Sequence, residues 1–313
     1  MAEEYPSAIE MVEVGPRDGL QNEKLLVSTE DKLALIERAI AAGSRRIEVA
    51  SFVNPRAVPQ MADAELVCEG LTQRDDVTYI GLVMNDRGAE RAIGTGRIDQ
   101  LGAVAVATDR FAMANQGQTS QGSVEAARAI IARARSAGLT GQATIAVAFG
   151  CPFEGEVSQD RIVAMAAAIA EVQPEEIGLA DTVGVADPAH VARLVEQVRE
   201  AVAPIPVRVH FHNTRGTGLA NVWAAIGVGA RIVDASIGGI GGCPFAPAAT
   251  GNVATEDVAY MLERAGIQTG LDLEVLLSSN HWLAEVMGRQ LPSMVGRAGL
   301  FPRPGTTPGE SVA

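Results

Sequence analysis

Short apolar segments alternate with amphipathic ones along almost the whole chain. Eight pairs, each a strand-like run followed by a helix-like run, lie between residues 9 and 266. In the first pair, "AIEMVEV" precedes "STEDKLALIERAIAAG", in which Leu33, Ile36 and Ile40 share one helical face. Ser28 or Thr29 can cap the start of that helix. This alternation predicts a parallel sheet covered by helices.

Eight such units, closed on themselves, make a (β/α)8 TIM barrel, and we expect this fold rather than an open, doubly wound sheet. Hydrophobic residues make up 47% of the chain and aromatic residues 4%, which suits parallel strands wrapped by helices. We expect residues 1–300 to form a single catalytic domain. Its helical extension, Leu271–Met287, could close one end of the barrel or pair subunits. Residues 301–313 are rich in Pro, Gly, Ser and Thr, and we expect them to be disordered.

The formal net charge of −13 argues against binding to nucleic acid or to anionic membranes. The chain lacks the apolar run of about 18 residues that a membrane span requires, and its start, "MAEEYPSAIE", lacks the apolar region of a signal peptide. Its three cysteines, at unrelated spacings, form no disulfide framework. We therefore expect a cytoplasmic protein in which local cations hold any anionic substrate.

Polar residues follow most of the strand-like runs, at the point where each run ends. In a TIM barrel the carboxyl ends of the strands share one rim, and the active site is built there. Residues far apart in the sequence are therefore expected to converge on one site. These residues are Arg17, Asp18, Glu48, Ser51, Asp181, His210, His212, Cys243 and Asn252.

The stretch "HFH" places His210 and His212 at the end of the seventh strand-like run. Side chains at positions i and i+2 of a strand point to the same face, so both imidazoles can reach one ion. A structural role for the histidines is the alternative, and Asp18 as an oxygen ligand favours the metal. Imidazole, carboxylate and amide ligands suit Mg²⁺ or Mn²⁺ and do not exclude Zn²⁺ or Co²⁺.

The loop "GGIGGCPFAPAATGN" has four glycines before Cys243, which allow motion and a close approach to a ligand. Cys243 could be a mobile acid or nucleophile. The alternative is a buried thiol in a flexible turn. Cys68 lies in a helix-like run, and we expect its side chain to pack in the core. Cys151 follows the fifth strand-like run, where it could line the rim without taking part in chemistry.

Several stretches of the chain resemble those of hydroxymethylglutaryl-CoA lyase and its near relatives, a family of metal-dependent lyases built on a TIM barrel. They are "VEVGPRDGLQNE", "IEVASFV", "GCPFEG", "ADTVG", "HFH" and "GGCPFAPAATGNVATEDVAYML". The resemblance implies that Arg17 and Cys243 are catalytic. It places Glu48 and Asp181 near the metal or the reacting hydroxyl, with Glu13 in support. The divalent-metal ligands that it implies are Asp18, His210, His212 and Asn252.

The reaction that the resemblance implies is a retro-Claisen cleavage. A 3-hydroxyacyl-CoA with a second carboxylate, such as 3-hydroxy-3-methylglutaryl-CoA (HMG-CoA), would yield acetyl-CoA and a keto acid, here acetoacetate. A divalent cation would bind the hydroxyl and a carboxylate oxygen, and His210 or Asp181 would take the hydroxyl proton. Arg17 would stabilise the enolate, and Cys243 would protonate it. The C-terminal helix favours a homodimer or a higher homo-oligomer.

Two stretches depart from the family pattern. In "HFHNTRGTG", Asn213 replaces an acid and Arg215 stands where an aromatic residue is usual, and the loop "TDRFAMANQG" also differs. These changes leave open a lyase for a related branched 3-hydroxyacyl-CoA such as citramalyl-CoA. A condensing acyltransferase of the same superfamily and a catalytically silent barrel are further alternatives. By position alone, Lys24 and Arg56 could bind CoA or could be solvated cations.

Overall fold

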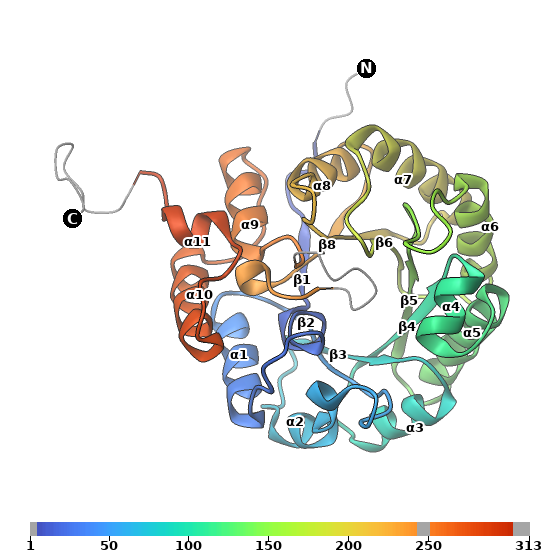
Figure 1. The fold of residues 1–313 in the computed structure, drawn as a ribbon, viewed down its shortest axis with the longest axis horizontal. Helices are drawn as coiled ribbons and strands as arrows, with labels where there is room; N and C mark the ends of the chain where they lie inside the picture. The colour runs from blue at the N-terminus through green and yellow to red at the C-terminus, as the bar shows by residue number, and fades with distance from the viewer. Residues whose placement is uncertain (1–4, 243–250, 303–313) are drawn as a thin grey trace.

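The computed structural model describes residues 5–242 and 251–302. Eight parallel strands form a closed barrel in sequence order (Figure 1). The barrel closes between the first and the eighth strand, where Glu10 pairs with Ile232 and Glu13 with Ala235. The TIM barrel is thus confirmed, and the open sheet is wrong. The strands are β1 (Glu10–Glu13), β2 (Arg46–Ser51), β3 (Thr78–Val83), β4 (Gln100–Val106), β5 (Thr140–Ala146), β6 (Ile177–Asp181), β7 (Val207–Phe211) and β8 (Ile232–Ala235).

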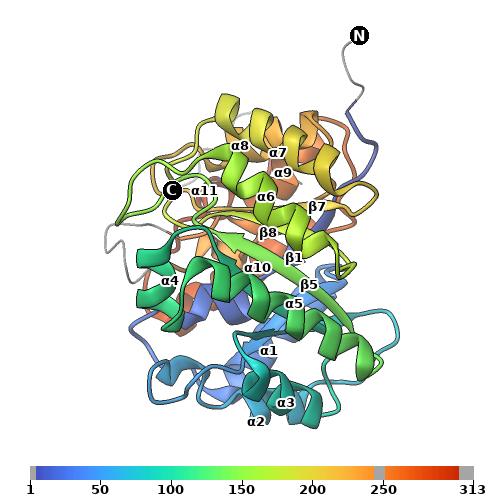
Figure 2. The same ribbon diagram turned by 90° about the vertical axis from the view of Figure 1, so that its right-hand side faces the viewer.

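Helices surround the strands, and Figures 1 and 2 show them on the outside of the barrel. They are α1 (Thr29–Ala41), α2 (Ala64–Gly70), α3 (Asp86–Gly94), α4 (Asp109–Gln116), α5 (Ser120–Ser136), α6 (Gln159–Ala170), α7 (Pro188–Val202), α8 (Gly218–Gly227), α9 (Thr255–Arg264), α10 (Leu273–Met287) and α11 (Met294–Ala298). Three short helical turns complete the described elements. These are η1 (Gly15–Gly19), η2 (Pro59–Met61) and η3 (Ile237–Gly239).

Local signals predict some helix boundaries and miss one helix. Ser28 is the cap of α1, because its Oγ accepts a hydrogen bond from the Asp31 amide at 3.1 Å. The stretch "TDRFAMANQG", interpreted from the sequence as a loop, contains the helix α4. This helix buries only Phe111 and Ala112. Its apolar pattern is therefore too short to predict a helix from periodicity.

The helix expected at Leu271–Met287 is confirmed as α10, which lies outside the barrel and packs against α1 and α9 (Figure 1). Arg38 of α1 lies over the Trp282 ring, 4.7 Å from its centroid. Asn280 of α10 donates to Glu256, whose carboxylate also accepts from the amide of Gly238. The extension therefore supports the turn η3, which follows β8 at the rim.

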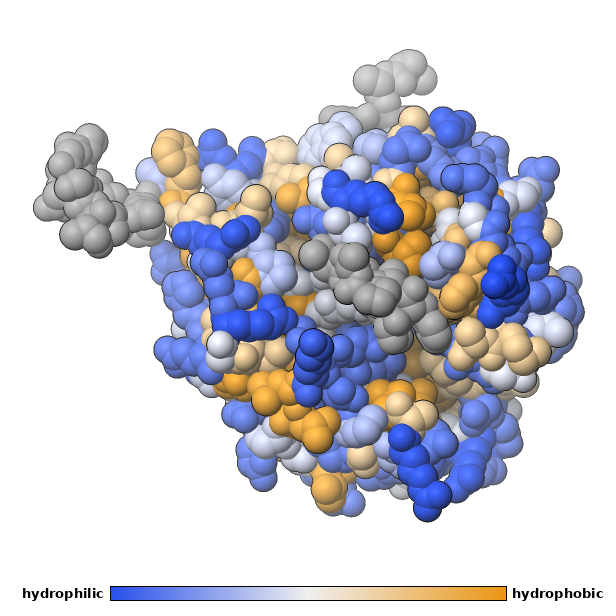
Figure 3. Space-filling model, in the orientation of Figure 1, coloured by the Kyte–Doolittle hydropathy of each residue, from blue (hydrophilic) through white to orange (hydrophobic). Residues whose placement is uncertain are grey.

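The helices and the surface within the described ranges can be compared with what a membrane span requires. No helix there is long and apolar enough to cross a bilayer. Figure 3 shows a face that is mainly hydrophilic, with separate apolar areas. Exposed apolar residues are dispersed, with Leu26 in the segment before α1 and Met294 in α11. Scattered residues of this kind are usual on folded domains.

A ladder of buried charged side chains lies inside the barrel, nearer than the rim to the amino-terminal ends of the strands. Arg46 of β2 donates two hydrogen bonds to Glu176, both of 2.8 Å. Glu176 also lies 3.1 Å from Nε of Arg208 on β7. Arg208 in turn donates to Asp234 of β8 at 3.0 Å. Branched apolar residues usually fill this space in a TIM barrel. The stability of this barrel therefore depends on complete pairing of its charges.

We expect Glu176→Ala to lower the free energy of unfolding by about 3–5 kcal/mol, because Arg46 and Arg208 would stay buried without their shared carboxylate. Chemical denaturation followed by circular dichroism measures this change. Glu175 is exposed, so Glu175→Ala is the control and should stay within about 0.5 kcal/mol of the parent. Equal losses in the two variants would show that the ladder does not stabilise the fold.

Candidate active site

The turn η1 brings two neighbouring charged residues, Arg17 and Asp18, to the mouth of the barrel. It follows β1, and the amide of Gly19 donates to the carbonyl five residues back at 3.1 Å. Such π-type turns are frequent at functional sites. Glycine is needed at position 15, because the Gly15 amide donates to Glu13 Oε1 at 2.8 Å and an added Cβ would lie 2.5 Å from that oxygen.

Glu13 joins this turn to the end of β8. Its Oε1 also accepts from the Ile237 amide at 3.0 Å, and its Oε2 accepts from Thr255 Oγ1 at 2.7 Å. Burial raises the pKa of Glu13 to about 7, although these hydrogen bonds favour the ionised form. Glu13 does not line the cavity described below. Its place fits the supporting role that the resemblance implies.

Asp18, His210 and His212 converge at the rim, with ligand atoms that all lie within 4.8 Å of one another. Asp18 Oδ2 is 3.9 Å from His210 Nε2 and 4.0 Å from His212 Nε2. Asn252 joins the group, since its Nδ2 donates to Asp18 Oδ2 at 2.8 Å. Burial would raise the pKa of Asp18, but the Arg17 guanidinium and the two imidazoles hold it well below its usual value. The carboxylate is therefore ionised.

These four side chains fit a divalent cation. They offer a carboxylate oxygen, two imidazole nitrogens and an amide oxygen, a set that several divalent metals accept. Asn252 Oδ1 is buried and accepts no hydrogen bond within the described ranges, so it is available as a ligand if the amide turns its oxygen toward Asp18. His210 Nδ1 lies 3.1 Å from Asp234 Oδ2. This contact favours a proton on Nδ1, and Nε2 is the nitrogen that faces Asp18 and would bind the ion.

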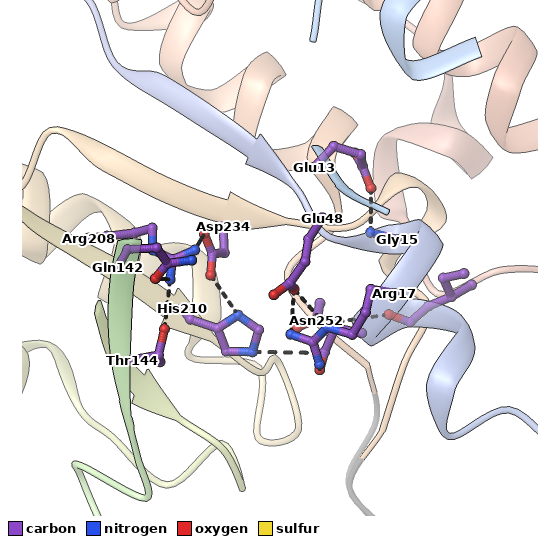
Figure 4. Close-up of polar contacts among 12 residues, drawn as sticks. Glu13, Gly15, Arg17, Glu48, Gln142, Thr144, Arg208, His210, Asp234 and Asn252 are labelled. Carbon is purple, nitrogen blue, oxygen red and sulfur yellow. Dashed lines mark hydrogen bonds and ion pairs between the residues drawn. The ribbon is translucent and has the colours of Figure 1, made fainter. Parts of the chain in front are cut away.

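Arg17 lies beside Glu48 (Figure 4) and also contacts Asp18. Its Nε donates to Glu48 Oε2 at 2.7 Å, and its Nη1 donates to Asp18 Oδ1 at 2.6 Å. Burial would lower the pKa of Arg17, but Glu48 and Asp18 raise it above its ordinary value, so the guanidinium stays charged. Burial raises the pKa of Glu48 despite the nearby guanidinium. A fixed positive charge thus lies beside the ligand set.

A cavity opens at the carboxyl ends of the strands, and Arg17, Glu48 and the ligand set of Asp18, His210 and His212 lie in its wall. Four polar residues from strand interiors also line it, and the pattern of strand ends does not reveal them. For Arg208 a usable signal exists, since it lies two positions before His210 and therefore shares its face. The four are Gln142, Thr144, Arg208 and Asp234.

The structure does not bring the carboxylate of Asp181 to the ligand set. Its Oδ1 accepts from the Val185 amide at 2.9 Å, and its Oδ2 accepts from the Ala186 amide at 3.0 Å. Both oxygens therefore hold the loop that follows β6. The neighbours Ala180 and Thr182 line the cavity, whereas Asp181 does not.

Three further cations and one serine considered from the sequence lie away from the cavity. Arg215 Nη1 donates to the carbonyl groups at positions 183 and 184, at 3.0 and 2.8 Å, and so ties the loop after β7 to the loop after β6. Lys24 and Arg56 are exposed, and Ser51 is buried. None of these four side chains lines the cavity.

The three cysteines are placed differently. Cys243 lies outside the described residues. Gly242, which precedes it, lines the cavity, and its carbonyl accepts a hydrogen bond from Asn22 Nδ2 at 2.9 Å. Cys68 and Cys151 are buried and do not line the cavity. Their positions agree with packing.

Comparison with known proteins assigns the chain to a family. The family model described as HMGL-like matches residues 8–282. The chain belongs to the HMGL-like family. The resemblance to hydroxymethylglutaryl-CoA lyases is thereby confirmed, and relatives that share at least 39% of their residues over most of the chain are carbon–carbon lyases. The HMGL-like protein is accordingly a carbon–carbon lyase of the hydroxymethylglutaryl-CoA lyase type.

Individual relatives are similar over nearly the whole length of this HMGL-like chain. It is 42% identical over 302 residues to (R)-citramalyl-CoA lyase of Chloroflexus aurantiacus, covering 93% of this chain and 95% of the relative. It is 39% identical over 289 residues to a hydroxymethylglutaryl-CoA lyase of Bacillus subtilis, covering 92% and 96%. A solved HMG-CoA lyase of Acinetobacter baumannii, in complex with coenzyme A and 3-methylmalate, has a TM-score of 0.91 at 39% identity and covers 96% and 98%.

We expect Asp234→Asn to weaken Mn²⁺ binding by about 10–100-fold, because a neutral amide holds the Nδ1–H of His210 less firmly. Calorimetry on metal-stripped protein measures the affinity, and circular dichroism checks the fold. Asp187→Asn is the control, since Asp187 caps α7 by accepting from the amides of Ala189 and His190, at 2.9 and 3.0 Å, and asparagine caps equally well. An unchanged affinity in Asp234→Asn would show that this carboxylate does not support the ligand set.

Proposed function

We propose that this lyase cleaves HMG-CoA, or a close 3-hydroxyacyl-CoA with a free carboxylate, to acetyl-CoA and a keto acid. With HMG-CoA the keto acid is acetoacetate. The observation that carries the proposal is the place of Arg17, which lies beside the ligand set in the wall of the cavity. The cleavage needs a bound hydroxyl, a proton acceptor and a positive charge where the enolate forms. The cavity offers groups for all three.

Asp18, His210, His212 and Asn252 would hold a divalent cation, for which we propose Mg²⁺ or Mn²⁺. When bound, the cation supplies Lewis acidity, which lowers the pKa of the substrate hydroxyl. Asp234 supports this role by holding His210 in one tautomer. The ionised state of Asp18 at neutral pH also favours the binding of a cation.

A proton acceptor must take the hydroxyl proton, and Glu48 is our candidate. Asp181 holds loop amides with both oxygens, and His210 faces the ligand set through Nε2. Glu48 lines the cavity, and its Oε1 accepts no hydrogen bond from any described residue. Burial raises its pKa, which brings it toward the range where a carboxylate is an effective base.

Arg17 would stabilise the enolate that forms on the thioester. A guanidinium carries five N–H groups, and its contacts with Glu48 and Asp18 use three of them. Two N–H groups therefore remain for the thioester oxygen. Cys243 stays the proposed acid for the enolate carbon, because Gly242 beside it lines the cavity.

(R)-Citramalyl-CoA is the second candidate substrate. The 42% identity to the Chloroflexus aurantiacus lyase favours it. Its carboxylate is bonded directly to the carbon that bears the hydroxyl, so the acyl chain is one methylene shorter than that of HMG-CoA. The same groups of the cavity would act on it, and the keto acid would be pyruvate.

We expect the purified protein to release acetyl-CoA from HMG-CoA or from (R)-citramalyl-CoA in the presence of Mg²⁺ or Mn²⁺. Mass spectrometry detects acetyl-CoA, and the keto acid, acetoacetate or pyruvate, identifies the substrate. Removal of the metal with EDTA should abolish the reaction, and added Mn²⁺ should restore it, because the ligand set needs an ion. If metal-loaded protein cleaves neither thioester, the proposal is wrong. Release of free CoA from acetyl-CoA and a keto acid would instead indicate a condensing enzyme.

The roles of Glu48 and Arg17 can be separated by steady-state kinetics. We expect Glu48→Gln to lower kcat by about 10²–10⁴-fold, since the amide cannot accept the proton. Arg17→Met should lower kcat by about 10²–10³-fold through loss of charge stabilisation. KM should change only a few-fold in both. Glu65→Gln, in a surface pair with Arg91, is the control. A rise in KM at constant kcat would show that the residue binds the substrate but takes no part in the chemical step.

A further inference from the structure

Gln142 and Thr144 form a second polar group in the cavity, away from Arg17. Both belong to β5, two positions apart, so their side chains point to the same side of the strand. Both line the cavity. Figure 4 shows them with Arg208 on one side of His210, while Arg17 lies on the other side. Glu48, the partner of Arg17, reaches toward this group, since Glu48 Oε1 and Gln142 Nε2 both lie near Gly102.

Arg208 determines which way the Gln142 amide points. A guanidinium can only donate hydrogen bonds, and Arg208 Nη2 donates to Gln142 Oε1. Nε2 of Gln142 must therefore face away from Arg208. This nitrogen lies on the side of Gly102, where an added Cβ would come within 3.1 Å of it. Although Gln142 is only 1% exposed, its Nε2 donates no hydrogen bond to any described residue.

Thr144 is oriented by the same guanidinium. Its Oγ1 accepts from Arg208 Nη2 at 2.6 Å, so its own hydroxyl hydrogen is free to point into the cavity. Gly178 on β6 leaves room for this arrangement, since a Cβ there would lie 2.7 Å from Thr144 Oγ1. Arg208 itself is neutralised by Asp234 and Glu176. The pair thus presents two neutral donors, while the acceptor oxygens face Arg208.

We infer that Gln142 and Thr144 donate to the oxygen of the substrate's free carboxylate that the cation does not hold. This inference rests on the proposed function, in which Arg17 takes the thioester oxygen. A carboxylate is the acceptor-only group of such a substrate, and it matches two donors that lack partners. A buried donor left unpaired is costly, so a thioester without the carboxylate should bind at least about 10-fold more weakly.

The test compares thioesters that differ only in the carboxylate. Glutaryl-CoA is butyryl-CoA with a terminal carboxylate. Succinyl-CoA is one methylene shorter than glutaryl-CoA and has the chain length of citramalyl-CoA. None of the three carries the 3-hydroxyl group, so retro-Claisen cleavage cannot consume them. Calorimetry with Mn²⁺-loaded protein measures each Kd. We expect the better of the two carboxylated thioesters to bind at least about 10-fold more tightly than butyryl-CoA.

Gln142→Glu keeps the shape of the side chain but replaces the donor nitrogen with an acceptor and adds an acidic group. It keeps an oxygen for Arg208 and replaces the Nε2 that faces the cavity with a carboxylate oxygen. Gln100→Glu is the matched control, because Gln100 is equally buried, accepts from Arg46 Nη2 at 2.8 Å and does not line the cavity. We expect Gln142→Glu to abolish the carboxylate advantage with the Kd of butyryl-CoA unchanged. Gln100→Glu should keep the advantage.

Thr144→Val serves as a second variant if Gln142→Glu does not fold, and it should reduce the advantage several-fold. The inference is overturned if the parent protein shows no carboxylate advantage, if the variants retain it, or if all thioesters weaken equally. These results are distinct from a failure of the proposed function. A parent that cleaves neither HMG-CoA nor (R)-citramalyl-CoA, yet shows a carboxylate advantage that depends on Gln142, would support the subsite and refute the lyase substrate.

Discussion

The ion pair between Arg208 and Asp234 joins two polar regions of the barrel interior. On one side, Arg208 faces Glu176 and, through it, Arg46 near the amino-terminal ends of the strands. On the other side, Asp234 contacts His210 at the rim. One contact therefore links a structural ladder to the set of side chains suited to a cation. Buried charges are stable only when their partners are in place, so the fold and the site geometry depend on the same pair.

Charge balance in this interior favours a cation at the rim. Four buried or nearly buried carboxylates face three guanidinium groups there. Asp18 shares Arg17 with Glu48, and its other neighbours are imidazoles and the amide of Asn252. Within a chain of net charge −13, an anionic CoA ester could approach this region only where positive charge is concentrated. Arg17 and a bound cation would provide that concentration at the cavity mouth.

The carboxylate subsite would give the cavity a direction. Arg17 and Glu48 lie on one side of His210, and Gln142 and Thr144 lie on the other (Figure 4). A thioester held with its carbonyl at Arg17 would place its far end against β5. The length of the acyl chain that fits between these groups would then distinguish HMG-CoA from (R)-citramalyl-CoA, because the two differ by one methylene.

The strand ends were predictable from the sequence. Side chains whose place in the site follows from standing at a strand end were therefore predictable too. Arg17, Asp18 and His210 belong to this class, whereas Asn252 lies well beyond the end of β8 and was predicted as a ligand from the family resemblance. Asp181 also stands at the end of β6, and its position predicted a place in the site. Two amides of the following loop donate to its carboxylate and hold it away from the ligand set. The direction of a side chain at a strand end depends on the loop that follows, and local pattern carries no information on that contact.

The alternation of apolar runs by itself predicted a parallel sheet covered by helices, and its eight units favoured a closed barrel over an open sheet. The motif residues determined which rim carries the chemistry. Only the tertiary structure decided the partners of Arg208, since Glu176, Gln142 and Asp234 come from three other segments of the chain. It also decided that the Gln142 amide presents its nitrogen to the cavity. Hydrogen bonds between distant segments leave no local pattern, so the sequence could not determine them.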